Sequence, residues 1–198
     1  LDWMREHAPE VSVLVGRENI GYGNAHNRLI QEAALGPGDC YLALNPDAVL
    51  APNYIACLVS ETSDKPEIGW AIGKLKLVTE DGAFDGRIYS AGHGMHRSGF
   101  AFNIGHGLRD EELFDTSREV FGAPGAAALY KAEMIRDLSE DGAFFDPAMF
   151  LYAEDSDVDW RAQRKGWKCW YAARAVGYHR GSSPQGALKM TAVGNRYL

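Results

Sequence analysis

The stretch of residues 40–62, CYLALNPDAVLAPNYIACLVSET, shows how this chain is built. Its first five residues form an apolar run with the length of a buried strand, and the Asn-Pro-Asp of residues 45–47 ends that run with turn-forming residues. A helix is expected next, from Pro52 or Asn53 to about Thr62, because proline suits the first turn of a helix. Strand, turn and helix in this order are typical of a layered α/β domain.

The alternation continues on both sides of this stretch. Residues 11–15 (VSVLV) are predicted to form another buried strand, and residues 24–34 a helix that ends at the Gly-Pro-Gly of residues 36–38. The elements expected further along are a long strand or strand pair at 68–78, helices at 131–138 and 156–165, and a strand at 168–176 that leads to His179.

A Gly/His-rich segment at about residues 84–118 interrupts this pattern. Six glycines and three histidines, His93, His96 and His106, fall between residues 86 and 107. We expect a long, pliable insertion within a single domain that spans residues 1–198. The histidines lack cysteines at zinc-finger spacing, which argues against a structural zinc site in this segment.

The overall composition excludes several classes of protein. The net charge of -7 comes from 20 Lys and Arg against 27 Asp and Glu, and it argues against a nucleic-acid partner because such proteins usually carry a basic face. The three cysteines are far apart and form no C-x-x-C pair, so a disulfide framework is not expected and a reduced, cytoplasmic setting is. No apolar run approaches the roughly 20 residues of a membrane-spanning helix.

An acidic helix start follows the apolar run of residues 145–152. It contains Glu154, Asp155, Asp157 and Asp159. Acidic residues in a first helical turn complement the partial positive charge of its free N–H groups, which is the ordinary interpretation. However, Asp155 and Asp159 lie one turn apart on one helical face, where like charges destabilise a helix. This cost indicates that one of the two serves chemistry, and the aromatic residues before them would raise the pKa of a nearby carboxyl group, as a general base requires.

Three further places combine chemistry with a position at the end of a predicted strand. The turn NIGYGNAHN (residues 19–27) could present N–H groups to a phosphate, or Asn24 could simply cap the following helix. The LNPDA of residues 44–48 places Asp47 where α/β sheets bind metals and ribose, although Asp47 could also only stabilise its turn. His179 follows the last strand and is either a hydrogen-bonded structural residue or a metal ligand.

In this order, these motifs resemble the family 2 glycosyltransferases, specifically the subgroup with rhamnosyltransferases of bacterial polysaccharide assembly. The segments that carry the resemblance are NIGYGNAHN (19–27), LNPDA (44–48), GAPGAAALYKAEMI (122–135), FDPAMFLYAEDSDVDWRAQRKGW (145–167) and YHRGSS (178–183). The resemblance implies a GT-A-like three-layer domain with a mostly parallel central sheet flanked by helices. The family's first nucleotide-binding strand is not recognisable before residue 11, so we expect a chain truncated at both ends.

The resemblance also implies roles for individual residues. Asp155 matches the catalytic base, and Glu154 would support or orient it. The residues that match donor-binding positions are Asn19, Gly21, Tyr22, Asn45, Asp47 and Gly125. Asp47 and His179 match the positions that hold a Mg²⁺ or Mn²⁺ ion, although Asn45 replaces the first acid of the family's Asp-x-Asp motif. Asp157 is expected to pair with Arg161 one turn later, and Asp159 is left without a role.

The function implied is an inverting transfer of a sugar from a nucleoside-diphosphate donor to a hydroxyl group of a saccharide or lipid-linked acceptor, in cell-surface polysaccharide synthesis. The donor expected first is dTDP-rhamnose, with UDP- and GDP-sugars as alternatives, and the setting is the cytoplasm, including peripheral association with the inner face of the membrane. A non-catalytic binding module of the same fold and a nucleotidyltransferase stay open as alternatives, although the basic, Gly-rich loop of the latter is not visible.

Overall fold

A computed structural model of the chain describes residues 2–79 and 81–180. The helices are α1 (Asp2–His7), α2 (Tyr22–Ala33), α3 (Tyr54–Thr62), α4 (Ala132–Leu138), α5 (Glu154–Arg164) and the short 3-10 helix η1 (Glu112–Phe114). The strands are β1 (Cys40–Leu44), β2 (Ala48–Leu50), β3 (Ile68–Val78), β4 (Phe84–Ser90), β5 (His93–Met95), β6 (Ala101–Asn103), β7 (Arg118–Val120), β8 (Ala127–Lys131) and β9 (Lys168–His179). The last three residues of the YHRGSS motif lie outside the described residues.

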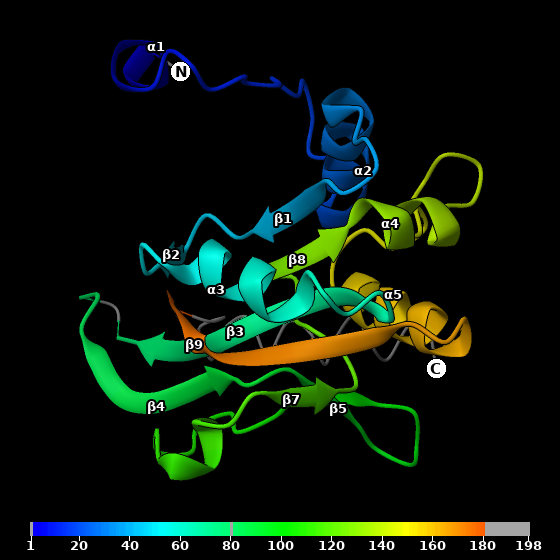
Figure 1. Ribbon diagram of the computed structural model, residues 1–198. Helices are drawn as coiled ribbons and strands as arrows, with labels where there is room; N and C mark the ends of the chain where they lie inside the picture. The colour runs from blue at the N-terminus through cyan, green and yellow to red at the C-terminus, as the bar shows by residue number, and fades with distance from the viewer. Residues whose placement is uncertain (1, 80, 181–198) are drawn as a thin grey trace.

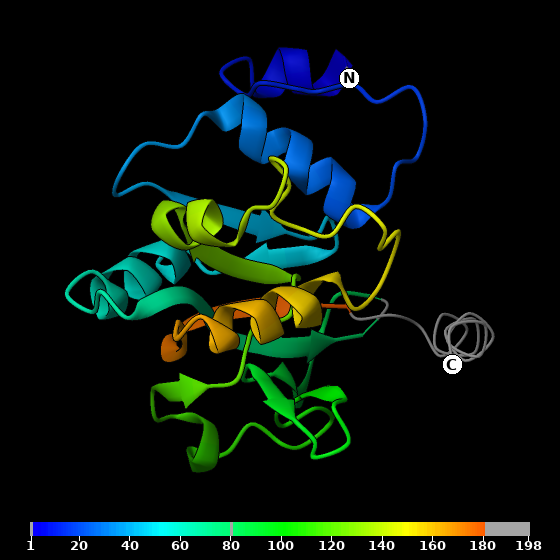
Figure 2. The same ribbon diagram turned by 90° about the vertical axis from the view of Figure 1, so that its right-hand side faces the viewer.

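One sheet with the strand order β1-β8-β3-β9-β2 forms the centre of the molecule, with β4 also paired to β3 and β7 to β9 (Figure 1). Helix α3 lies on one face of this sheet and α5 on the other, which gives three layers (Figures 1 and 2). The α/β class and the flanking helices are therefore confirmed.

The prediction of a mostly parallel sheet is wrong. Among the described strands, β3 and β9 pair in parallel, and the other pairs are antiparallel. Parallel neighbours need a crossover connection, which is usually helical. The chain between β3 and β9 contains α4 and α5, whereas the chain from β3 to β8 runs through hairpins and loops with only the three-residue helix η1. Strand β8 therefore enters between β1 and β3 in the opposite direction.

Buried aromatic residues hold the layers together. Tyr54 of α3 is fully buried, and its hydroxyl donates to the carbonyl of Ala127 (2.8 Å) while accepting the N–H of Gly73 (3.0 Å). One side chain therefore satisfies backbone groups of two neighbouring strands. On the other side, Phe144 and Phe145 pack edge-on at 4.8 Å between their ring centroids and bury the segment that leads into α5.

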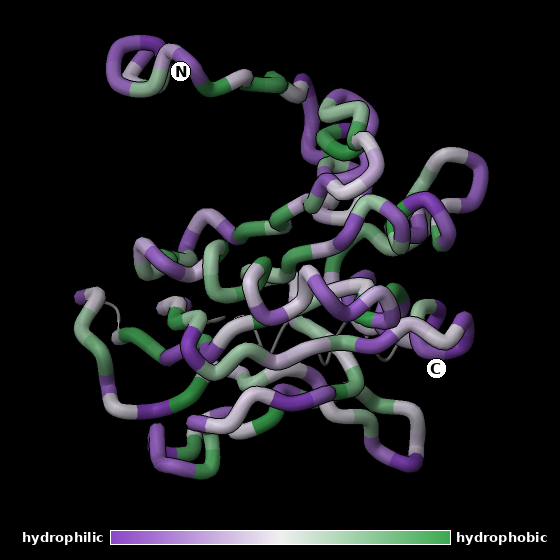
Figure 3. Tube along the Cα trace, in the orientation of Figure 1, coloured by the Kyte–Doolittle hydropathy of each residue, from purple (hydrophilic) through white to green (hydrophobic). Residues whose placement is uncertain are grey.

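Residues 11–15 do not form the strand that their apolar sequence predicts. They are irregular, and Val11, Val13, Leu14 and Val15 keep 37–58% of their surface exposed. Figure 3 shows this apolar segment extended away from the sheet, near the N-terminus. A strand requires a partner for its backbone N–H and C=O groups, and none of the described strands pairs with this segment.

The Gly/His-rich segment is more ordered than its composition suggests. Strand β4 joins the central sheet through β3, and β5 and β6 form a separate two-stranded sheet. Its histidines turn to different partners, because His96 contacts the Ser98 hydroxyl (2.7 Å) and His106 the carbonyl of Tyr89 (2.9 Å). Within the described residues no group of three His, Cys, Asp or Glu side chains is arranged to hold a metal ion.

Candidate active site

The N-terminus of α2 is fixed against the segment that precedes α5. Gly21, with φ of 84°, comes directly before the helix, and a Cβ atom there would overlap with the carbonyl of Phe150. The next residue, Tyr22, donates its N–H to that same carbonyl at 3.1 Å. The side chain of Asn19 accepts the N–H of Gly21 at 3.0 Å, so it shapes the turn. The helix starts before Asn24, whose side chain donates to the carbonyls of Ile20 and Pro147, and the helix-cap interpretation of Asn24 is therefore wrong.

Tyr22, Gly125 and Asp155 form a continuous chain of hydrogen bonds. The Tyr22 hydroxyl donates to the carbonyl of Gly125 (2.7 Å), and the N–H of Gly125 donates to Oδ2 of Asp155 (3.0 Å). A Cβ atom at position 125 would lie 2.6 Å from the Tyr22 hydroxyl, so a side chain here would force the tyrosine to shift. Oδ1 of Asp155 accepts the N–H of Ser156 at 2.7 Å. The structure thus brings together three residues that the sequence placed far apart, and it fixes both oxygens of the Asp155 carboxylate.

The backbone before α5 adopts an unfavourable conformation. Tyr152 and Ala153 have φ values of 70° and 71°, a region that residues with a side chain seldom occupy. Conformations of this kind cost about 1–3 kcal/mol each and occur often at functional sites. Here they turn the chain sharply, so that α5 starts at Glu154, two residues earlier than predicted.

Glu154 and Asp155 point into different environments. Glu154 is 7% exposed, and its Oε2 has no hydrogen-bond partner among the described residues. Burial, followed by the charge of Asp155, raises the pKa of Glu154 to about 7. Of the aromatic residues expected to line the site, Phe144 and Phe145 are buried, whereas Phe150 and Tyr152 are exposed. The raised pKa expected for this segment is found at Glu154 and also at Asp159, where burial raises the pKa to about 6.

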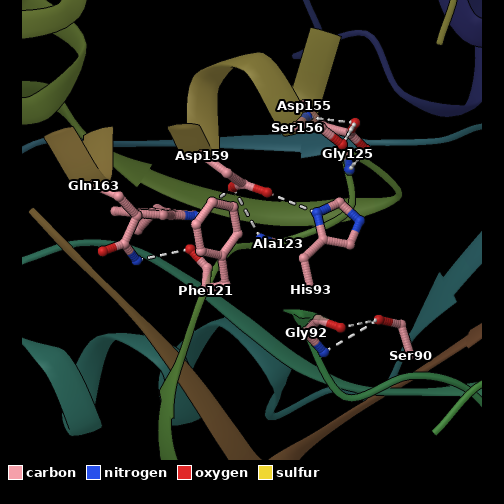
Figure 4. A network of polar contacts seen from close by, with 11 residues as sticks. Ser90, Gly92, His93, Phe121, Ala123, Gly125, Asp155, Ser156, Asp159 and Gln163 are labelled. Atoms are coloured by element: carbon pink, nitrogen blue, oxygen red, sulfur yellow. Dashed lines mark hydrogen bonds and ion pairs between the residues drawn. The ribbon is translucent and has the colours of Figure 1, made fainter. Parts of the chain in front are cut away.

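The last two positions of the acidic helix start each have a clear partner. Asp157 accepts a hydrogen bond from Nε of Arg161 at 2.7 Å, which confirms the predicted pair. Asp159, which the sequence left without a role, is fully buried and contacts His93 (Figure 4).

A second group of polar side chains forms where β2 pairs with the end of β9. The pairing of Ala48 with His179 brings the Asn-Pro-Asp turn beside the histidine. Nε2 of His179 lies 3.1 Å from Oδ1 of Asp47 and 3.3 Å from Nδ2 of Asn45. His179 is 3% exposed, and its Nδ1 has no partner in the part of the chain that the structure describes. Burial lowers the pKa of His179, which favours the neutral imidazole.

The residues of this second group fit a divalent ion. A carboxylate and a neutral imidazole are both suitable ligands for such ions. Asp47 and His179 would hold such an ion, since a carboxylate oxygen and a ring nitrogen already lie 3.1 Å apart. Asn45 adds an amide in place of a second acid. Two protein ligands leave several positions for water and for phosphate oxygens, as is usual for Mg²⁺ at nucleotide sites.

Two contacts connect the groups. The N–H of Asn45 donates to the carbonyl of Ala126 at 3.0 Å, directly after Gly125. Tyr89 packs edge-on against His179, with 4.3 Å between the ring centroids. Burial is the largest cause of the raised pKa of Tyr89, and the charges of Asp155 and Asp47 are both close enough to add to it. Sequence reasoning missed Tyr89 because a tyrosine in a glycine-rich segment carries no sign of the strand pairing that places it here.

A surface cavity of about 200 Å³ lies at the N-terminus of α2. Its lining includes Asn19, Gly21 and Arg28. Free N–H groups at a helix N-terminus, together with a guanidinium group, can bind an anionic ligand.

The chain is similar in sequence and in fold to known glycosyltransferases. No protein-family model matches the chain. Over 191 residues the chain is 27% identical to N-acetylglucosaminyl-diphospho-decaprenol L-rhamnosyltransferase of Mycobacterium tuberculosis, in the sequences of strains CDC 1551 / Oshkosh and ATCC 25618 / H37Rv. These matches cover 86% of this chain and 59% of each relative, so the chain spans less than two thirds of the relatives' length.

A solved structure, that of GalNAc-T7 with UDP, GalNAc and Mn²⁺, superimposes with a TM-score of 0.66 at 16% identity. The match covers 92% of this chain and 35% of the chain in the solved structure. At this identity the match establishes the fold. The chain therefore has the GT-A glycosyltransferase fold and is related in sequence to rhamnosyltransferases.

Proposed function

We propose that this chain forms the catalytic site of an inverting glycosyltransferase, which moves a sugar from a nucleoside-diphosphate donor to a hydroxyl group of a saccharide or lipid-linked acceptor. The strongest support is that one loop, which contains Gly125 and Ala126, hydrogen-bonds to both groups of polar side chains. Gly125 binds the proposed base Asp155, and the adjoining Ala126 binds the Asn-Pro-Asp turn beside His179.

Asp155 is the proposed general base. Its two oxygens accept N–H groups of Gly125 and Ser156, so the carboxylate is held in place before substrate arrives. Oδ1 also accepts the Ser156 hydroxyl at 3.3 Å, whereas Oδ2 keeps a further lone pair, with which Asp155 can accept the proton of the acceptor hydroxyl as the hydroxyl oxygen attacks the anomeric carbon. Positioning of this kind is the main requirement for a general base.

The donor is proposed to lie between Tyr22 and the Asp47–His179 pair. Asn19 and Gly21 shape the α2 N-terminus, whose N–H groups attract an anionic ligand, and Gly125 keeps this part of the wall free of a side chain. Asp47 and His179 would hold Mg²⁺ or Mn²⁺, which supplies positive charge for the departing diphosphate. In this proposal the acceptor oxygen attacks the anomeric carbon from the face opposite the departing diphosphate, which inverts the configuration without a covalent sugar-enzyme intermediate.

The relatives suggest the chemical class of the substrates. Their name specifies transfer of L-rhamnose to N-acetylglucosaminyl-diphospho-decaprenol, so we propose dTDP-rhamnose as the first donor to test and a saccharide on a lipid diphosphate as the acceptor. Such an acceptor would bring the protein to a membrane surface and connect it with polysaccharide synthesis. The described residues include no helix whose length and hydropathy suit a membrane span.

The test is transfer of labelled rhamnose to N-acetylglucosaminyl diphosphate with a short prenyl chain, with and without Mn²⁺. Asp155→Asn should reduce turnover by about 10²–10⁴-fold, the usual range for loss of a general base, while the affinity for the donor stays within twofold in calorimetry. Asp141→Asn is the matched control, because Asp141 is exposed and asparagine suits its φ of 48°. Unchanged turnover in Asp155→Asn would exclude this base, and donor binding without any transfer would favour a non-catalytic binding protein.

A further inference from the structure

Asp159 occupies a site that is built for a carboxylate. It is fully buried on α5, one turn after Asp155. Its Oδ1 accepts the indole N–H of Trp70 (2.9 Å) and the N–H of Ala123 (3.1 Å). A Cβ atom at Gly122 would overlap with the carboxyl group, so the loop leaves room for Asp159 only because glycine stands there.

The other oxygen of Asp159 orients His93, the first residue of β5. Oδ2 lies 2.6 Å from Nδ1 of the imidazole (Figure 4). A carboxylate in this position places the ring proton on Nδ1, and the second nitrogen, Nε2, is then left with a free lone pair. The side chain of His93 is 7% exposed, and Nε2 has no hydrogen-bond partner among the residues that the structure describes.

This arrangement carries a cost for Asp159. A fully buried carboxylate loses its hydration, which raises the pKa of Asp159 to about 6. An apolar pair of similar size would fill the same space without this cost. A carboxylate holds a histidine in this way at sites where the free ring nitrogen binds a ligand.

His93 lies beside the proposed base. Its N–H donates to the carbonyl of Gly122 at 2.7 Å, three residues before Gly125. In Figure 4 the imidazole of His93 lies on the same side of Asp159 as Gly125 and Asp155. Burial alone would lower the pKa of His93. The hydrogen bond and charge of Asp159, followed by the charge of Asp155, raise it above its usual value, so Asp155 is close to the ring. The metal-binding pair is separate, because Asp47 and His179 have no contact with His93 among the hydrogen bonds and ring contacts of the described residues.

We propose that His93 contacts the acceptor saccharide and that Asp159 positions it, with Nε2 hydrogen-bonded to a hydroxyl group of the sugar that Asp155 deprotonates. The proposal rests on the proposed function and adds an acceptor-binding residue to it. A hydroxyl group suits this position because it can donate to Nε2 of a neutral ring and accept from Nε2 of a protonated one.

The decisive variant is His93→Asn. The asparagine amide can still donate to Asp159 from near the position of Nδ1, but it lacks the atom that corresponds to Nε2. We expect the KM for the prenylated N-acetylglucosaminyl diphosphate to rise about five- to tenfold, the effect of one lost hydrogen bond, while the donor KM and Tm change little. Asp159→Asn should show the same loss to a smaller degree. His96→Asn, an exposed histidine of the same segment, is the matched control.

A binding measurement separates this proposal from the proposed function. In protein labelled with ¹⁵N-histidine, the same acceptor is added without donor, and the His93 ring signals are identified by their absence in His93→Asn. A shift of the Nε2 signal that saturates with acceptor supports the contact, even if transfer to this acceptor fails. Acceptor binding that leaves the Nε2 signal unchanged, absence of acceptor binding, or an unchanged acceptor KM in His93→Asn would overturn it.

Discussion

Replacement of Glu154 by glutamine should change how the stability of the protein depends on pH. The carboxyl group of Glu154 is buried, with Oε2 unpartnered, and its pKa rises from 4.5 to about 7 on folding. The folded state therefore binds the proton more tightly than the unfolded chain. This group favours folding fully below about pH 4.5, and its contribution is lost as the pH rises to about 7.

The size of the effect follows from the shift. Each pKa unit corresponds to about 1.4 kcal/mol, so the full shift corresponds to about 3 kcal/mol. Water that reaches part of the carboxyl group screens its charge, which reduces the expected difference to about 1–2 kcal/mol. Glutamine has the same shape without the charge. Glu154→Gln should thus be more stable than the parent by about 1–2 kcal/mol at pH 8 and nearly equal to it at pH 5.

Urea unfolding followed by tryptophan fluorescence at pH 5 and pH 8 measures both free energies. Glu32→Gln, at an exposed position of α2, controls for the general effect of losing one negative charge. A difference between Glu154→Gln and the parent that is the same at both pH values would refute the reasoning, because it would show that Glu154 has the same pKa in the folded and unfolded states.

Three further predictions concern the loop of residues 122–126, which contacts both groups of polar side chains, and the residues beside it. Gly122→Ala should destabilise the protein by at least about 2 kcal/mol in urea unfolding, because its methyl group overlaps with the buried carboxyl group of Asp159; an unchanged midpoint would mean that the loop adapts freely. Tyr22→Phe should cost about 1 kcal/mol in the same assay, through loss of the hydrogen bond to Gly125, and a more stable variant would contradict this. Asp47→Ala should raise the Mn²⁺ concentration for half-maximal transfer by at least about tenfold, and an identical Mn²⁺ titration would remove Asp47 from the metal site.

Local sequence patterns predicted most of the helices and long strands. Residues 40–44 and 68–78 form strands as predicted, and the helix after residue 53 ends at Thr62. In these segments the apolar pattern and the turn residues agree, so local and tertiary preferences coincide. Residues 11–15 have an equally apolar pattern but form no strand, since strand formation depends on a partner that the segment itself cannot supply.

The candidate site shows the same contrast between what local sequence predicts and what depends on contacts between distant segments. Motif order identified Asp155, Gly125, Tyr22, Asp47 and His179, and the structure brings them into two connected groups. Tyr89 and His93 could not be found in this way, because their roles arise from contacts across strands and loops. Asp159 was recognised as an unexplained carboxylate, and only the fold revealed its partner 66 residues earlier in the chain.

The sequence by itself determined the kinds of chemical groups that this protein carries and the order of its helices and most of its strands, because helix and strand patterns and turn residues act over a few neighbouring positions. The tertiary structure alone decided the direction of β8, the separate environments of Glu154 and Asp155, and the pairing of His93 with Asp159. These features depend on which distant segments meet and on how much water is excluded when they do, and neither is encoded in any short stretch of the chain.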